Sequence, residues 1–148
     1  MSLFDRLQGA RTEKIAAEKA AGAAFLESNQ KKEGVQLFEN AIQYKILQPG
    51  SGERPSPSAT IKAHYIGRLL NGTEFDNSYK RGKPFTAPLS ALIKGWQYTI
   101  PKMTVGSKWQ IWIPSDLAYG DAGVGQAGIP GGAVLDFEIE LLEIVSGK

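Results

Sequence analysis

The chain of 148 residues is long enough for one full domain and an appended segment. Hydrophobic residues make up 42% and charged residues 22%, as in a soluble globular protein, and a net charge of +2 does not predict nucleic-acid binding. The absence of Cys excludes disulfides, zinc–thiolate sites and a cysteine nucleophile.

The sequence shows neither a membrane span nor a targeting segment. No apolar run approaches the roughly 20 residues that cross a bilayer. The N-terminus lacks the basic and then apolar pattern of a signal peptide, so the default prediction is a cytoplasmic protein. A signal peptide that had been removed would instead place the protein in the periplasm or at the cell surface. Met1 could also be a cloning start, in which case the natural chain is longer.

Residues 3 to about 32 are predicted to form a helix, because Ala is dense, Pro is absent and charges of both signs are interspersed. The few large apolar residues do not form a continuous stripe, so this helix cannot carry a core of its own. We expect its end near Phe25 and Leu26 to dock on the main domain, and its start to project into water or meet a partner. The chain therefore divides into an N-terminal helix and linker, residues 1–34, and a main domain, residues 35–148.

The main domain has the alternating apolar pattern of antiparallel strands. This alternation occurs in four segments, residues 42–46, 61–65, 109–113 and 135–141. Asn71-Gly72 is the favoured two-residue hairpin turn, after which Thr73 to Phe75 restart a strand. Residues 92–100 have a short helical pattern that Pro101 stops. We predict an α+β fold in which an antiparallel sheet buries one face against this short helix.

Aromatic residues recur between positions 65 and 120 at turns and element ends, where a simple core would not place them. They are Tyr65, Phe75, Phe85, Trp96 and Tyr119. The carboxylate of Asp76 and the guanidinium of Arg81 lie among them, close enough in sequence to pair across a loop. An aromatic hollow with one oriented polar pair suits a compact apolar group. The pattern favours the proline ring, and so either an isomerase or a binder of proline-containing peptides.

Two other patterns could indicate a nucleotide site and a catalytic or zinc site, but both are better explained by structure. Gly123, Gly125 and Gly128 have the spacing of a dinucleotide fingerprint, but a strand rather than a helix is expected after them. A Gly-rich surface loop that rims a binding site is the better interpretation. His64 is the only His, and it alternates with Tyr65 so that the two side chains face opposite sides of the sheet. We expect a structural or solvated role for it.

Three carboxylates, Asp136, Glu138 and Glu140, share one face of the last strand. Paired carboxylates can indicate a glycosidase. On alternate residues of one strand, opposite an apolar face, they are more simply a solvated surface.

Seven motifs in order and spacing resemble the FKBP-type peptidyl-prolyl cis-trans isomerases over about residues 41–145. These motifs are Ala63-His64-Tyr65-Ile66-Gly67, Asn71-Gly72-Thr73-Glu74-Phe75-Asp76-Asn77-Ser78, Arg81-Gly82-Lys83-Pro84-Phe85, Ile93-Lys94-Gly95-Trp96, Met103-Thr104-Val105-Gly106, Leu117-Ala118-Tyr119-Gly120 and Phe137-Glu138-Ile139-Glu140-Leu141. The segment from Phe25 to Val35 resembles the bacterial branch that includes macrophage infectivity potentiator proteins. In that branch N-terminal helices form a homodimer, which the resemblance makes possible here.

The resemblance implies a five- or six-stranded antiparallel half-barrel wrapped around one short helix and preceded by an N-terminal helix. It implies a catalytic set of Asp76, Tyr119, Phe75, Trp96, Tyr65 and Phe137, and a substrate-binding set of Arg81, Phe85, Leu92, Ile93 and Ile129. Trp96 would form the floor under the proline ring, and the Tyr119 hydroxyl and Ile93 N–H would bind substrate carbonyls. Asp76, oriented by Arg81, would supply negative potential. Family members of this kind often bind tacrolimus and rapamycin, and the resemblance implies no metal or cofactor.

Three departures from the family pattern carry expectations of their own. Gly131-Gly132 stands where this branch usually has Pro-Asn, which should loosen the pocket rim. Asp136 replaces a usual apolar residue and is expected to point outward. The N-terminal segment is shorter than the usual dimerisation arm.

Three hypotheses follow. The first is an active isomerase that assists protein folding by accelerating Xaa-Pro rotation, which is slow without a catalyst. The second is a binding module that holds proline-containing or unfolded segments, with catalysis incidental. The third is that residues 1–32 exist mainly for self-association.

Overall fold

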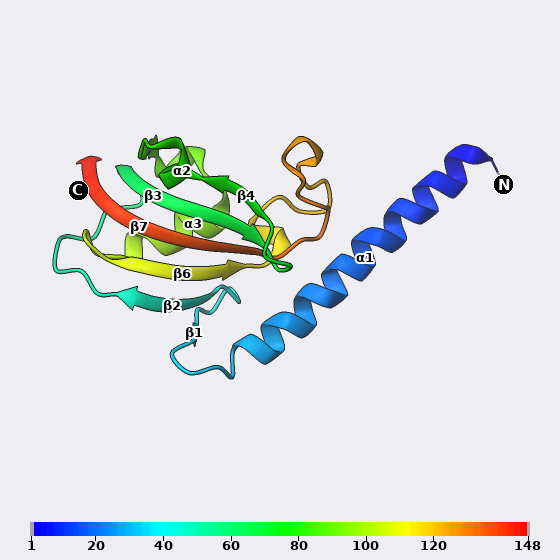
Figure 1. The fold of residues 1–148 in the computed structure, drawn as a ribbon, viewed down its shortest axis with the longest axis horizontal. Helices are drawn as coiled ribbons and strands as arrows, with labels where there is room; N and C mark the ends of the chain where they lie inside the picture. The colour runs from blue at the N-terminus through cyan, green and yellow to red at the C-terminus, as the bar shows by residue number, and fades with distance from the viewer. Residues whose placement is uncertain (1, 148) are drawn as a thin grey trace.

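The computed structural model describes residues 2–147 as one long helix followed by a sheet that curves around a short helix (Figure 1). All strand pairs are antiparallel, and the sheet order is β1-β2-β6-β7-β3-β4, with β5 also pairing with β3. The strands are β1 Gln36–Leu37, β2 Gln43–Gln48, β3 Thr60–Leu69, β4 Glu74–Asn77, β5 Phe85–Pro88, β6 Lys108–Ile113 and β7 Leu135–Ser146. The helices are α1 Leu3–Asn29, α2 Ser78–Arg81 and α3 Lys94–Thr99. The predicted α+β class is confirmed, although the sheet has seven strands rather than five or six because short edge segments such as β1 add to it.

The core lies between the concave face of the sheet and α3. Residues in β3 and β7 alternate between buried and partly exposed, and Tyr65 lies opposite Ile139 in the register of these two strands. Gly95 lets α3 approach closely, since a Cβ there would lie 2.5 Å from Ile113. The α3 helix ends where a 3-10 turn containing Pro101 begins, as the sequence predicted.

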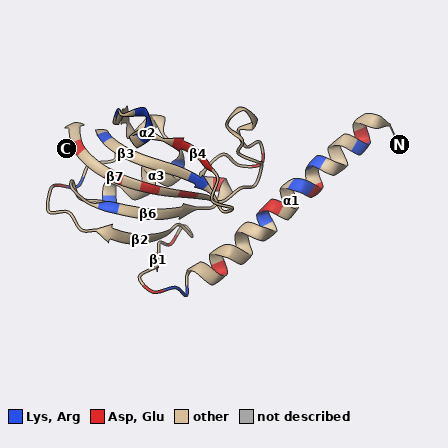
Figure 2. Cartoon of the chain, viewed as in Figure 1, with Lys and Arg blue, Asp and Glu red and all other residues tan. Residues whose placement is uncertain are grey.

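The α1 helix contacts the domain over a longer stretch than expected. Its start is capped by Ser2 and Asp5, and residues 2–14 are exposed. From residue 15 onward a helical stripe is buried or half-buried, formed by Ile15, Glu18, Gly22, Phe25, Leu26 and Asn29. The docked part of the helix is therefore about three turns longer than the predicted contact near Phe25 and Leu26. Figure 2 shows charged residues of both signs along the same helix. Because these charges interrupt the apolar positions, the sequence shows no continuous hydrophobic stripe.

A buried polar junction fixes the end of α1 to β2. The Asn29 side chain, 1% exposed, donates from Nδ2 to Gln43 Oε1 at 2.9 Å. Gln43 Nε2 in turn donates to the backbone oxygen of Leu26 at 2.8 Å. Because buried amides are costly to leave unpaired, this pair sets how the helix leaves the sheet.

The convex face of the sheet carries the residues for which structural roles were predicted. The His64 Nδ1 lies 2.7 Å from Ser78 Oγ, and its ring stacks on Tyr79 at 4.4 Å. Glu138 pairs with Arg68 at 3.1 Å, and Glu140 accepts a hydrogen bond from Tyr79 at 2.7 Å. His64, Glu138 and Glu140 therefore each have a partner on the convex face, away from the core.

Asp136 also points to the convex face but is less solvated than predicted. It borders a cavity together with Phe25 and Asn29 of α1, and Gln110 Nε2 donates to its two oxygens at 3.0 and 3.2 Å. Burial raises the pKa of the Asp136 carboxyl above its usual value, and the Gln110 hydrogen bonds oppose that shift only in part.

Asp136→Asn is therefore expected to raise the free energy of unfolding at pH 7. A carboxyl whose folded pKa is raised binds more protons in the folded state, so stability falls as pH rises through its titration range. Asn removes that penalty and keeps an oxygen for Gln110. Urea unfolding at several pH values should show an advantage at pH 7 that shrinks as wild-type Asp136 becomes protonated in acid. Lower stability of the variant at pH 7 would contradict this account.

Candidate functional site

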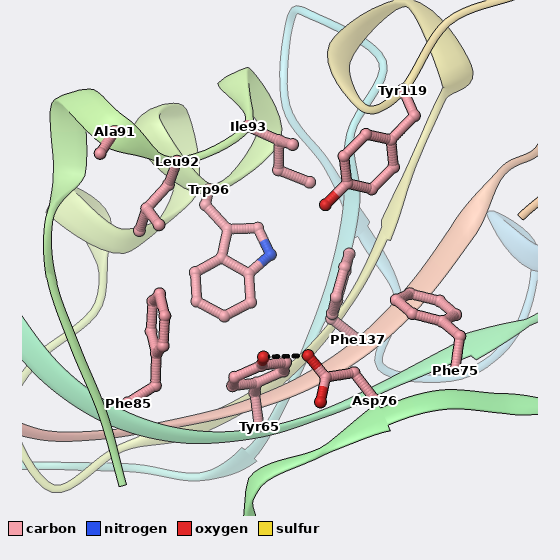
Figure 3. Close-up of a pocket in the computed structure, with 10 residues that line it drawn as sticks. All are labelled: Tyr65, Phe75, Asp76, Phe85, Ala91, Leu92, Ile93, Trp96, Tyr119 and Phe137. Atoms are coloured by element: carbon pink, nitrogen blue, oxygen red, sulfur yellow. Dashed lines mark hydrogen bonds between the residues drawn. The ribbon is translucent and has the colours of Figure 1, made fainter. Parts of the chain in front are cut away.

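A cavity of about 220 Å³ opens at the concave end of the sheet (Figure 3). It is lined by Tyr65, Phe75, Asp76, Phe85, Ala91, Leu92, Ile93, Trp96, Tyr119 and Phe137. The strands β3, β4, β5 and β7 supply five of these side chains, α3 supplies the Trp, the 3-10 helix Leu89–Ala91 supplies Ala91, and loops supply the other three. The volume is below the roughly 300–1,000 Å³ of sites for drug-sized ligands, so the cavity suits a compact ring.

Trp96 forms the floor of this cavity and is 5% exposed. Its ring meets those of Tyr65 and Phe137 edge-on, with centroids 5.1 and 5.3 Å apart and interplanar angles of 85° and 88°. Phe85 makes a similar contact at 6.3 Å. The indole N–H has no hydrogen-bond acceptor among the described residues, and Figure 3 shows it on the side of the ring toward Phe137. This perpendicular packing is the favoured aromatic geometry and holds the floor rigid.

Gly67 on β3 makes room for two of the cavity walls. A Cβ at this position would lie 2.6 Å from the Phe75 ring and 2.9 Å from the Phe137 ring. These two rings are themselves perpendicular, 5.7 Å apart. The absence of a side chain at Gly67 therefore determines the positions of the Phe75 and Phe137 rings.

Gly67→Ala is expected to destabilise the protein by about 1–3 kcal/mol, because the added methyl overpacks the site. It should also displace Phe75 or Phe137 and thereby reduce ligand affinity. Urea unfolding and peptide titration would measure the two effects. Gly9→Ala is the control for crowding, since nothing lies within 4 Å of a Cβ on this exposed part of α1, and it should raise stability slightly because Ala favours a helix more than Gly. Unchanged stability and affinity in Gly67→Ala would contradict the packing argument.

The polar group of the site is a carboxylate held from two sides. The Tyr65 hydroxyl donates to Asp76 Oδ2, and Arg81 Nη1 donates to Asp76 Oδ1. The N–H of Asn77 also donates to Oδ1 at 2.9 Å. Burial, followed by the hydrogen bond to Asp76, raises the pKa of Tyr65 to about 12. Tyr65 therefore remains a neutral donor at physiological pH, and the carboxylate keeps one orientation.

Two donors at the cavity have no partner within the described chain. The Tyr119 hydroxyl points into the cavity in Figure 3 and makes no hydrogen bond to residues 2–147. Burial, with a smaller contribution from the Asp76 charge, raises the pKa of Tyr119, so it too stays protonated. The Ile93 N–H precedes α3 and is likewise without an acceptor in the described residues. Both donors are available to a ligand.

The structure brings together nearly all of the residues predicted for the site. Two of them lie outside the cavity lining. Arg81 stands behind Asp76 and orients it, as expected. Ile129 is 4% exposed, and its backbone pairs with that of Val124 to close a loop, so the structure places it outside the residues that line the cavity. Ala91 lines the cavity and was missed, because a small residue beside Leu92 gives no sequence signal.

Comparison with known proteins identifies the family. The model described as FKBP-type peptidyl-prolyl cis-trans isomerase matches residues 51–142. The chain belongs to this family. A second FKBP model, the domain amino terminal to the isomerase, matches residues 1–46. The predicted boundary near residue 34 thus falls inside the match to that second domain model.

Bacterial FKBP-type isomerases are similar over most of this chain. The FKBP-type 22 kDa isomerase of Escherichia coli is 41% identical over 143 residues, which cover 97% of this chain and 69% of that protein. The isomerase Mip of Coxiella burnetii is 44% identical over 121 residues, covering 82% of this chain and 52% of the relative. The crystal structure of FkpA from Escherichia coli matches with a TM-score of 0.89 and 36% identity over 95% of this chain and 65% of that one. The chain therefore spans about half to two thirds of these FKBP relatives.

The helices of the structure and the name of one relative bear on where the protein is located. None of the helices in residues 2–147 is long and apolar enough to cross a membrane. The cytoplasmic default has no support among the FKBP relatives, one of which, from Legionella longbeachae, is named an outer membrane protein. Among the described residues, no group of three or more His, Cys, Asp and Glu side chains could hold a metal ion.

Proposed function

We propose that this chain accelerates cis–trans rotation of Xaa-Pro bonds in folding proteins without forming a covalent intermediate. The observation that carries the proposal is the aromatic cavity itself. It combines a rigid Trp96 floor with two free donors, the Tyr119 hydroxyl and the Ile93 N–H. A proline ring would lie on Trp96, and the donors would hold carbonyl groups on either side of it.

The physical basis is the selective stabilisation of the twisted amide. Rotation crosses a barrier of about 18–20 kcal/mol, because amide resonance is lost. The planar amide is charge-separated, whereas the twisted amide is less polar, so a dry aromatic cavity disfavours the planar form. Fixing the peptide on both flanks adds binding energy that is greatest in the twisted geometry.

Asp76 would contribute through its charge rather than through proton transfer. A carboxylate near the imide carbonyl disfavours the planar amide, whose oxygen carries most of the negative charge. Arg81 and Tyr65 hold Asp76 in one orientation, so no reorganisation is needed when the bond twists. We propose Asp76, Tyr119, Phe75, Trp96, Tyr65 and Phe137 as the catalytic set, and Arg81, Phe85, Leu92 and Ile93 as the substrate-binding set.

The test is the rate of cis-to-trans conversion in a short Xaa-Pro peptide, with and without rapamycin. We propose that rapamycin and tacrolimus occupy the same cavity, so acceleration should disappear when the drug is added. Tyr119→Phe should retain the fold and lose much of the acceleration. No acceleration by folded wild-type protein would overturn the proposed catalysis and leave the binding-module hypothesis as the better account.

Exposed apolar side chains at the start of α1 support a role for this helix in self-association. Leu3, Phe4 and Leu7 are 71%, 68% and 61% exposed and lie within about one turn of each other. We propose that they meet a second copy of the chain in a homodimer. Light scattering at high protein concentration should show a dimer mass that falls in Leu7→Glu; a monomer mass for the wild type would contradict the proposal.

The same exposed surface is the reason to keep the binding-module hypothesis. A chaperone that holds unfolded segments needs apolar surface outside the small cavity. Client aggregation assays in Tyr119→Phe and Phe75→Ala discriminate between the two functions. If holding survives the loss of isomerisation, the functions are separate.

A further inference from the structure

The loop between the 3-10 helix Ser115–Leu117 and β7, residues 118–134, packs against the middle of α1. We call it the rim loop because it carries Tyr119. Lys19 Nζ of α1 lies 2.6 Å from Asp121 Oδ1, two residues after Tyr119. Figure 1 shows this orange loop beside the middle of the helix rather than near its docked end. The contact therefore joins the N-terminal segment to a wall of the cavity.

Glycines allow the two backbones to approach closely. A Cβ on Gly132 would lie 2.9 Å from both the Ile15 backbone oxygen and Lys19 Cγ, and one on Gly131 would lie 3.1 Å from Ile15 Cγ1. Gly132 also has φ +83°, a conformation that favours glycine. Gly22 of α1 makes a similar approach, since its Cβ would be 2.6 Å from Val134. The glycine pair that was predicted to loosen the rim is instead packed under α1, and Gly132 is buried.

Backbone hydrogen bonds connect the contact between α1 and the rim loop to Tyr119. The Gly132 N–H donates to the Gly120 oxygen at 2.9 Å, which closes the base of the rim loop. The Gly120 N–H donates to the backbone oxygen of Ser115 at 2.8 Å, and the Gly123 N–H donates to the backbone oxygen of Tyr119 at 3.1 Å. Hydrogen bonds therefore fix the backbone at Tyr119 and at Gly120, and the partner of Gly120, Gly132, packs against α1.

We propose that α1 positions the Tyr119 hydroxyl for substrate, with Ile15 and Lys19 as the positioning residues. The inference rests on the proposed isomerase function of the same cavity. Because the contacts are within one chain, the effect does not require a dimer.

Charge reversal at the ion pair tests the proposal in the full-length chain. Lys19→Asp should lower kcat/KM for an Xaa-Pro peptide roughly two- to fivefold, mainly through KM, which is the size expected of one exposed ion pair. The double variant Lys19→Asp/Asp121→Lys should recover most of the loss. Lys14→Asp is the matched control, since it makes the same charge change on an exposed part of the same helix. Light scattering on each variant would check that the substitutions leave the oligomeric state unchanged.

A double-mutant cycle separates positioning from general stability. If Lys19 acts through the Tyr119 hydroxyl, Lys19→Asp should have no further effect in a Tyr119→Phe background. If Lys19→Asp lowers kcat/KM equally in the wild-type and Tyr119→Phe backgrounds, or does not lower it in an active wild type, the inference is overturned. An inactive wild type would overturn the proposed function instead. In that case the amide NMR shifts of Tyr119 and Gly120 decide the positioning, because they should move in Lys19→Asp and stay fixed in Lys14→Asp.

Discussion

Replacing Trp96 with Ala should lower the free energy of unfolding by about 3–5 kcal/mol and abolish measurable isomerisation. The side chain is 5% exposed and touches the rings of Tyr65, Phe85 and Phe137. Its removal leaves a hole beneath three aromatic rings, which would tilt into the space and lose their perpendicular packing. Stability and function should fall together, because the same ring supports the core and forms the floor for proline.

Trp96→Leu separates the two effects. Leu keeps an apolar side chain and should recover part of the stability, but it provides no flat surface for the proline ring. Urea unfolding gives the free energies, and the peptide assay should be run at a temperature where each variant is folded. Wild-type activity in a folded Trp96→Ala protein would show that proline does not rest on this residue.

Asp76→Asn should reduce kcat/KM by about 100-fold while the fold is retained, at the low end of the roughly 100- to 1,000-fold loss seen when a preorganised electrostatic group is removed. The shape of the side chain is kept, but the charge is lost and one of the two acceptor oxygens becomes an NH2 donor. Arg81 and the Tyr65 hydroxyl would lose their charged partner, and the negative potential at the cavity would vanish. The assay is kcat/KM for an Xaa-Pro peptide.

The titration of Tyr65 reports independently on the same change. In the wild type its raised pKa, about 12, means that the stability it contributes is present below pH 10 and is lost as pH rises through 12. Asp76→Asn should lower this pKa, because the hydrogen bond to Asp76 and its charge both raise it, whereas the Arg81 contributions that lower it remain. Glu74→Gln is the control, since it makes the same change on β4 where the carboxylate instead pairs with Lys80. Unaltered activity in Asp76→Asn with a lowered Tyr65 pKa would show that the charge has no catalytic role.

Much of the cavity could be predicted because its residues lie on regular elements at fixed spacing. Alternation along β3 places Tyr65 on the concave face and His64 on the other, and this holds whatever surrounds the strand. Phe75 and Asp76 follow a hairpin turn whose geometry is local. The position of Ile129 outside the cavity lining could not be predicted in this way, because it lies in a loop, where no periodicity indicates the direction of a side chain and a backbone bridge joins it to Val124.

The sequence by itself determined the fold class, the family resemblance and the aromatic pocket, since each depends on short-range pattern and motif order. Only the tertiary structure decided how α1 lies on the domain. Its contact with the rim loop depends on Gly22, Gly131 and Gly132, which carry no hydrophobic signal and act by letting backbones approach. Close approach is a property of two distant segments at once, so no pattern within either segment reveals it.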